Sequence, residues 1–171
     1  PYFKNMFKAG WQESAAKQIK IEFENTAIFE MLINYFYTGE LEINAKNSSD
    51  LVSACEYFCL TDLKEQLSTF MTHQVNHSNC IAFYRTARVY HLEALEMHCA
   101  NFIKRNFKEV LASKGFEELF EEELVYFLSG DSLNVPNEDL IFQSVLRWVN
   151  VNKAERTEAF GRVVPLIRFP L

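Results

Sequence analysis

Two cysteines and two histidines have a spacing that is typical of metal sites. Cys55 and Cys59 are followed by His73 and His77, close to the pattern of a two-cysteine, two-histidine zinc finger. A zinc finger presents its cysteines from a hairpin, whereas Cys55 and Cys59 fall one turn apart in a helical pattern that also carries Leu51. We therefore interpret these cysteines as core residues and expect neither a metal ion nor a cofactor.

The carboxylates and loops of this sequence do not form a pattern that indicates catalysis. Glu122 and Glu123 are neighbours on a predicted helix, so their side chains diverge and cannot act as an acid and base pair. The sequence does not decide whether the acidic run from Glu121 to Glu123 is more than a solvated face at a helix start. Neither a glycine-rich phosphate loop nor a nucleophile elbow is present, so the chain is predicted not to be an enzyme.

The composition predicts a helical binding module. The chain has 171 residues, 49% of them hydrophobic, with 16 Phe but only 5 Gly and 4 Pro. The net charge of −6 comes without a basic patch, so nucleic acid is not an expected partner, and no apolar run suggests a membrane. Without a signal pattern, we expect a reducing compartment, the cytoplasm or also the nucleus. Small buried thiols are expected at all four cysteines, Cys55, Cys59, Cys80 and Cys99.

The first 75 residues predict a mixture of strands and helices. Apolar and polar residues alternate over 19–23 and again near 41–43, which is typical of short half-buried strands. Asn25 is predicted to cap a helix that Gly39 ends. Two further helices are predicted at about 48–60 and 62–75.

Only helices are needed after Asn76. Ser78 is predicted to cap the first of them, and a break is expected near His91. Successive antiparallel hairpins with loops of ordinary length account for this order. The later helices are expected around Glu109, Phe116, Leu124, Trp148 and Phe160.

The stretch GDSLNVPNEDLIFQSVLRWV, residues 130–149, predicts a turn followed by a capped amphipathic helix. Pro136 restricts the backbone and Asn137 can accept the first free N–H groups. Ile141, Val145 and Trp148 then recur at helical spacing, so we expect Trp148 to be buried.

This stretch closely resembles the second half of the BACK domain of kelch-like proteins. PYFKNMF, YFYTGELEI and CEYFCLTDLKEQLSTFM resemble, in order, parts of a BTB domain, and the SNC at 78–80 resembles the start of the first BACK helices. The resemblance implies a mainly helical α+β fold, with a partial BTB domain at 1–75 and a partial BACK domain of helical hairpins at 76–171. It also implies a fragment that lacks the first BTB strands, the dimer-forming helix and the kelch repeats.

The resemblance implies a substrate adaptor of a cullin-3 ubiquitin ligase. Trp11 and Glu13 match the bulky residue and glutamate of the cullin-binding loop, where an aromatic anchor fills a pocket and a carboxylate fixes the register. The alternative is a Trp11 side chain that folds back onto its own domain. A second contact, the three-box, matches the start of BACK, although Ile81 and Tyr84 could instead pack the core. The implied cullin-binding residues are Met6, Trp11, Glu13, Cys80, Phe83 and Tyr84.

Other hypotheses for the function stay open. The family also implies a homodimer in the full-length protein and a protein substrate bound by the kelch domain. A dimerising cytoskeletal or actin-associated kelch-like scaffold that recruits no ligase is the first alternative. A small helical enzyme or metal-dependent domain is the second, and a stoichiometric bound metal would favour it.

Overall fold

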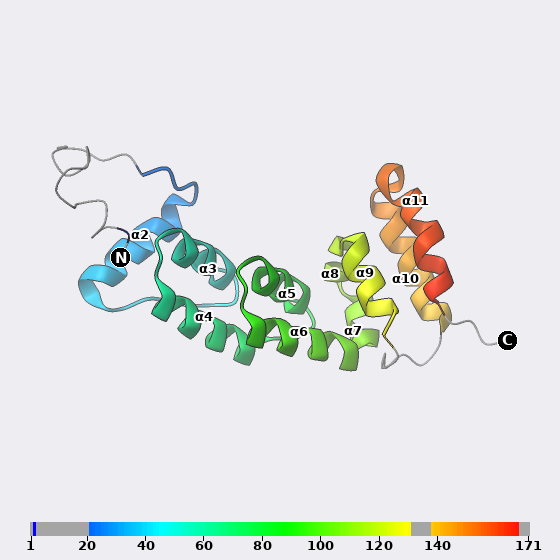
Figure 1. The fold of residues 1–171 in the computed structure, drawn as a ribbon, viewed down its shortest axis with the longest axis horizontal. Helices are drawn as coiled ribbons and strands as arrows, with labels where there is room; N and C mark the ends of the chain where they lie inside the picture. Colours follow the sequence, from blue (N-terminus) through cyan, green and yellow to red (C-terminus); the bar gives the residue numbers. More distant parts are fainter. Residues whose placement is uncertain (1, 3–20, 131–137, 168–171) are drawn as a thin grey trace. The chain divides into compact units, whose positions relative to one another are not determined.

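The computed structural model describes Tyr2, residues 21–130 and residues 138–167, which form helices and their connections (Figure 1). The elements in chain order are α2 (Thr26–Thr38), α3 (Ser48–Tyr57), α4 (Thr61–Gln74), α5 (Cys80–Val89), α6 (Glu93–Arg105), α7 (Phe107–Ala112), α8 (Lys114–Glu118), α9 (Glu121–Leu128), α10 (Glu138–Val151), α11 (Lys153–Val163) and the 3-10 helix η2 (Val164–Leu166).

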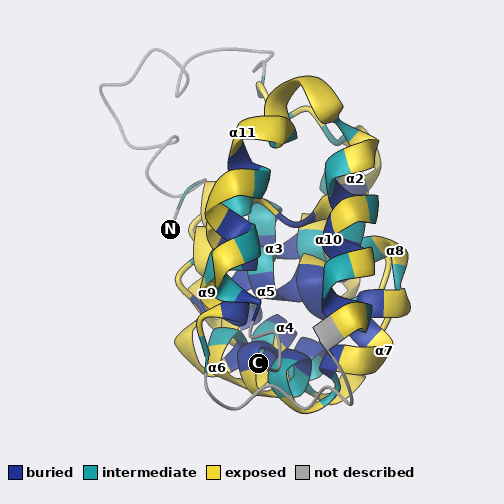
Figure 2. Ribbon diagram, turned by 90° about the vertical axis from the view of Figure 1, so that its right-hand side faces the viewer, coloured by how far each residue is buried: buried dark blue, intermediate teal, exposed yellow. Residues whose placement is uncertain are grey.

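The chain forms two compact units. The first contains residues 1–74 and 86–92, and the second contains residues 75–85 and 93–171. Helix α5 therefore contributes its first six residues to the second unit and its last four to the first. Each unit has buried residues along one side of its helices and exposed residues along the other (Figure 2).

Helix α2 begins and ends where the sequence predicts. The Asn25 side chain accepts a hydrogen bond from the backbone N–H of Ile28 at 3.2 Å, which satisfies one of the free donors of the first turn. Gly39 has a φ of 75° and its N–H donates to the carbonyl of Tyr35 at 2.8 Å. This left-handed conformation suits glycine because it has no Cβ, so both predicted helix boundaries are confirmed.

The short strands predicted for the first 75 residues are not found in the described part of the chain. Residues 21–23 and 41–44 have no regular structure, although partly buried and exposed residues alternate in both segments. After Leu41 a side chain, and not a neighbouring strand, bonds to the backbone: the Asn47 amide donates to the carbonyl of Glu42 at 3.0 Å. The alternation predicted burial correctly, but it could not supply the second strand that a sheet requires. Ile19 lies outside the described residues.

Helices α3 and α4 pack side by side and form the core of the first unit (Figure 1). Their buried residues recur at helical spacing, as the sequence predicts. They are Leu51, Val52, Cys55, Leu63, Leu67 and Met71.

Two helices of the first unit end on a residue other than glycine in the left-handed conformation. Cys59 after α3 has a φ of 55°, and His91 after α5 has a φ of 54°. In each case the next residue closes the helix end, with Leu60 N–H donating to Cys55 O and Leu92 N–H donating to Ala87 O, both at 2.8 Å. The break near His91 is confirmed. The prediction that Cys59 is buried within a helix is wrong, because α3 ends before Cys59 and its side chain is exposed.

The second unit contains the first six residues of α5, together with α6 to α11 and η2. Trp148 is 1% exposed and lies on the buried stripe of α10 with Ile141 and Val145, which confirms the stripe. Pro136 and Asn137, the predicted turn and cap, lie outside the described residues. Ser78 does not cap α5, since the helix begins at Cys80 and the Ser78 hydroxyl donates to the Asn76 side chain at 2.6 Å.

Candidate functional site

The structure places half of the predicted cullin-binding residues. Met6, Trp11 and Glu13 lie outside the described residues. The other three lie on α5 and belong to the core, where Cys80, Phe83 and Tyr84 are 0%, 1% and 4% exposed. Ile81 is buried beside them, as the packing alternative expected. A contact of these three side chains with a partner stays a prediction. In this structure they are the buried face of α5 and pack it against the core.

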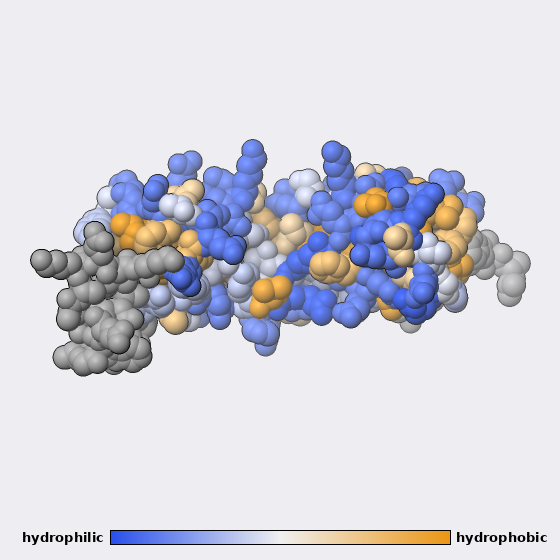
Figure 3. Space-filling model, turned by 90° about the horizontal axis from the view of Figure 1, so that it is seen from above, coloured by the Kyte–Doolittle hydropathy of each residue, from blue (hydrophilic) through white to orange (hydrophobic). Residues whose placement is uncertain are grey.

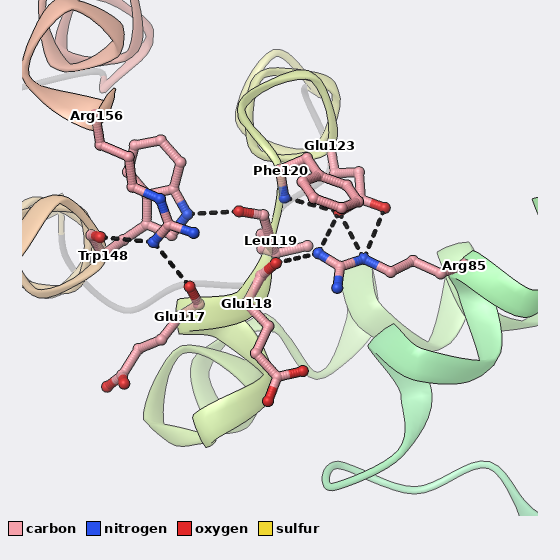
Figure 4. Close-up of polar contacts among 8 residues, drawn as sticks. All are labelled: Arg85, Glu117, Glu118, Leu119, Phe120, Glu123, Trp148 and Arg156. Atoms are coloured by element: carbon pink, nitrogen blue, oxygen red, sulfur yellow. Dashed lines mark hydrogen bonds and ion pairs between the residues drawn. The ribbon is translucent and has the colours of Figure 1, made fainter. Parts of the chain in front are cut away.

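The end of α8 and its connection to α9 are held by side chains of three other helices of the fold. Three successive backbone carbonyls, those of residues 117–119, each accept a hydrogen bond from a side chain (Figure 4). The donors come from three helices: Arg85 of α5, Trp148 of α10 and Arg156 of α11. Carbonyls at a helix end have no partner within the helix, so these donors satisfy them and join the end of α8 to three other helices. We call residues 117–120 with these donors the linker hub.

Arg85 and Glu123 form a partly buried ion pair in the hub. The Arg85 Nε lies 3.1 Å from both carboxylate oxygens of Glu123, and its Nη2 lies 2.9 Å from Oε2. Arg85 Nη2 also donates to the Glu118 carbonyl, and the guanidinium lies 4.2 Å from the centre of the Phe120 ring. Glu123 in turn accepts from the Phe120 N–H at 2.9 Å, at the start of α9. The carboxylate is therefore satisfied by a cation and a helix start together.

Trp148 and Arg156 complete the hub from the other side. The Trp148 Nε1 donates to the Leu119 carbonyl at 2.7 Å, and the Arg156 guanidinium lies 4.3 Å from the centre of the indole. Arg156 Nη1 donates to the carbonyls of Glu117 at 2.9 Å and of Trp148 at 2.8 Å. Burial is the main cause that lowers the pKa of Arg156, which nevertheless remains a cation.

Three carboxylates of the acidic run before and within α9 pair with arginines. Arg162 donates to the two carboxylate oxygens of Glu121 at 2.5 and 2.9 Å, and this bond holds the Glu121 pKa below its usual value. Arg147 lies 2.7 Å from Glu117 in a second ion pair. Glu123 is 3% exposed, so this run is more than a solvated face, which decides the question that the sequence left open. The sequence missed the partners because Arg85 and Glu123 stand 38 residues apart. The usual capping signal for this helix start is absent from the sequence, because Phe120 stands where Ser or Thr would be expected.

Three thiols are buried and chemically quiet. Burial raises the pKa of Cys55 and Cys99 to about 12 and that of Cys80 to about 11. A thiol with such a pKa carries almost no thiolate near neutral pH, which is the form that reacts or binds metal. Cys59 points to solvent instead, so it does not share a helix face with Cys55.

The described residues contain no group of three or more histidine, cysteine, aspartate or glutamate side chains that could hold a metal ion. Nor does any helix of the described segments have both the length and the apolar character needed to cross a membrane. The face of the molecule in Figure 3 is largely hydrophilic, with hydrophobic residues in separate small patches. The large hydrophobic side chains that are exposed include Val89, Met97 and Phe120.

Paired helices around the linker hub, with its arginine and tryptophan donors, define a helical module. A family model described as "BTB And C-terminal Kelch", abbreviated BACK, matches residues 80–171, and a BTB/POZ domain model matches residues 1–75. The chain therefore belongs to the kelch-like family of BTB and BACK proteins.

Relatives match along the whole chain. Kelch-like protein 40 of Xenopus laevis is 30% identical over 171 residues, which are 100% of this chain and 28% of that protein. Kelch-like protein 3 of Homo sapiens is 29% identical and kelch-like protein 2 of Rattus norvegicus is 30% identical, each over 100% of this chain and 29% of the relative. The chain thus spans less than a third of the length of these relatives.

Proposed function

We propose that this chain is the BTB and BACK portion of a substrate adaptor for a cullin-3 ubiquitin ligase. The observation that carries the proposal is the order of the two family matches, BTB at 1–75 and BACK at 80–171, in a chain matched end to end by kelch-like proteins. The linker hub adds support, because its ionic groups are bonded to one another and to the backbone, as in a scaffold.

In this proposal the loop that carries Trp11 and Glu13 binds cullin-3, with Met6 alongside. An aromatic anchor contributes most when it fills a pocket, and a nearby carboxylate orients the contact through directed hydrogen bonds. Helix α5, with Cys80, Phe83 and Tyr84, supports the second contact, in which these buried residues fix the backbone that the partner meets.

The adaptor itself performs no chemistry. Partner enzymes transfer ubiquitin, and the adaptor raises the effective concentration of a substrate lysine near the loaded conjugating enzyme. In the whole protein, the BTB domain forms a homodimer and a kelch domain binds the protein substrate. We place this activity in the cytoplasm, with the nucleus as a second location.

The test is a titration of the full-length protein, with its complete BTB domain, against the cullin-3 amino-terminal domain. Trp11→Ala and Glu13→Ala are each expected to weaken binding by at least ~1–2 kcal/mol, while the melting temperature stays near that of the wild type. Tyr126→Ala and Glu158→Ala are matched controls, since they remove an exposed aromatic residue from α9 and an exposed carboxylate from α11.

Three results would count against the proposal. If both loop variants bind like the wild type, the loop is not the cullin contact. If Trp11→Ala instead melts the domain, Trp11 is a core residue. A wild-type protein that dimerises but never binds cullin-3 would favour the cytoskeletal scaffold.

A further inference from the structure

Helix α9 contacts α5 at two neighbouring residues of α5. Glu123 binds Arg85 through both carboxylate oxygens, and Phe127, one turn further along α9, has its ring centre 5.3 Å from that of Tyr84. One contact is ionic and the other aromatic, and together they limit both sliding and rotation of residues 80–85 of α5 against α9.

The ionic contact has a fixed geometry. The Arg85 side chain is 23% exposed and that of Glu123 is 4% exposed, so water screens the pair only from one side. The Phe120 ring stacks on the guanidinium and the Glu118 carbonyl accepts from it, so Arg85 is held on three sides (Figure 4). A planar guanidinium satisfies all of these partners at once, which a lysine ammonium could not do.

We infer that Arg85 and Glu123 are positioning residues for the proposed cullin contact, because their ion pair sets the place and rotation of α5. The inference rests on the proposed function, since α5 carries the three residues that the family pattern assigns to the second contact. Glu123 is buried on α9 and is not one of the three residues assigned to the contact, so in this inference it acts through Arg85 and does not itself meet the partner.

Glu123→Gln is the sharpest perturbation. It keeps the size of the side chain and an oxygen that accepts from the Phe120 N–H, but it removes the charge that holds Arg85. Glu121→Gln is the matched control, because Glu121 also lies in the first turn of α9 and pairs with an arginine, Arg162 of α11. Val145→Ala on α10 is a second control that lowers stability through a buried side chain outside α5.

The experiment combines two measurements on the full-length protein and these variants. The first is the affinity for the cullin-3 amino-terminal domain at a temperature well below every melting transition. The second is amide hydrogen exchange of residues 80–85. We expect Glu123→Gln to weaken binding about fivefold and to speed exchange in α5, while both controls stay within about twofold of the wild type.

The outcomes separate the inference from the proposed function. Wild-type affinity or unchanged α5 exchange in Glu123→Gln would overturn the positioning role, and so would an equal loss of affinity in Val145→Ala, which would reveal a general effect of stability. If the wild type does not bind cullin-3 at all, the proposed function fails. Faster α5 exchange in Glu123→Gln would then still show that the ion pair holds the helix, but the assigned role in cullin binding would be refuted.

Discussion

Replacing Trp148 with alanine should be among the most destabilising single changes in the second unit. Its side chain is 1% exposed, its Nε1 donates to the Leu119 carbonyl at 2.7 Å, and Arg156 stacks on its ring. Removing a buried tryptophan costs about 3–5 kcal/mol through lost contacts and the cavity left behind. The unpaired Leu119 carbonyl accounts for about 1–3 kcal/mol of such a loss. That is a large share of the ~5–15 kcal/mol by which domains are stable.

The assay is urea unfolding followed by the helical circular dichroism signal, with each transition fitted separately because the chain has two units. Trp148→Phe keeps most of the apolar ring but loses the donor, so we expect it to cost about 1–3 kcal/mol. Val151→Ala is the control on the same helix; its side chain is 56% exposed and its loss should change stability by about 0.5 kcal/mol or less. A loss below about 1 kcal/mol for Trp148→Ala, or equal losses for the Ala and Phe variants, would refute this account of the hub.

The remaining predictions concern thiols, metal and pH. Native protein should show one fast-reacting thiol, which Cys59→Ser removes, whereas denatured protein should show four; more than one fast thiol in native protein would contradict the assigned burial. A chelator should leave the helical signal and the melting temperature unchanged, and a marked loss of structure would revive the zinc hypothesis. Arg162 lowers the pKa of Glu121, so their pair stabilises the fold above the usual value of 4.5 and this contribution disappears as the pH falls through the lowered pKa. The wild type should therefore have a higher melting temperature than Glu121→Gln at neutral pH, and this difference should disappear in acid. A difference in melting temperature that stays constant with pH would contradict the assigned role of the pair.

Local signals in the sequence predicted much of the helical order. Asn25 and Gly39 bound α2 because a side-chain acceptor and a left-handed residue act within one turn of the helix end. Trp148 was predicted to be buried because its stripe repeats at helical spacing, and α10 has that stripe. Such features depend on neighbours in the chain, so one sequence is enough to predict them.

The end of α3, and features that depend on distant partners, were not predictable in the same way. The apolar pattern near Cys59 continued the helix, but the end of α3 is set by the Leu60 N–H bonding back to Cys55. Alternation near residue 41 predicted a strand, but a strand is stable only when it pairs with a second one. No local pattern shows whether that second strand is present. The pairing of Arg85 with Glu123 likewise depends on how α5 and α9 pack, so the sequence showed the two charges and not their contact.

Direct binding tests the central claim most simply. Isothermal titration of the unaltered full-length protein with the cullin-3 amino-terminal domain should show saturable binding of one cullin domain to each protomer. Loss of that binding in Trp11→Ala, with the melting temperature preserved, would support the adaptor role. No detectable binding by a folded, dimeric wild-type protein would contradict it.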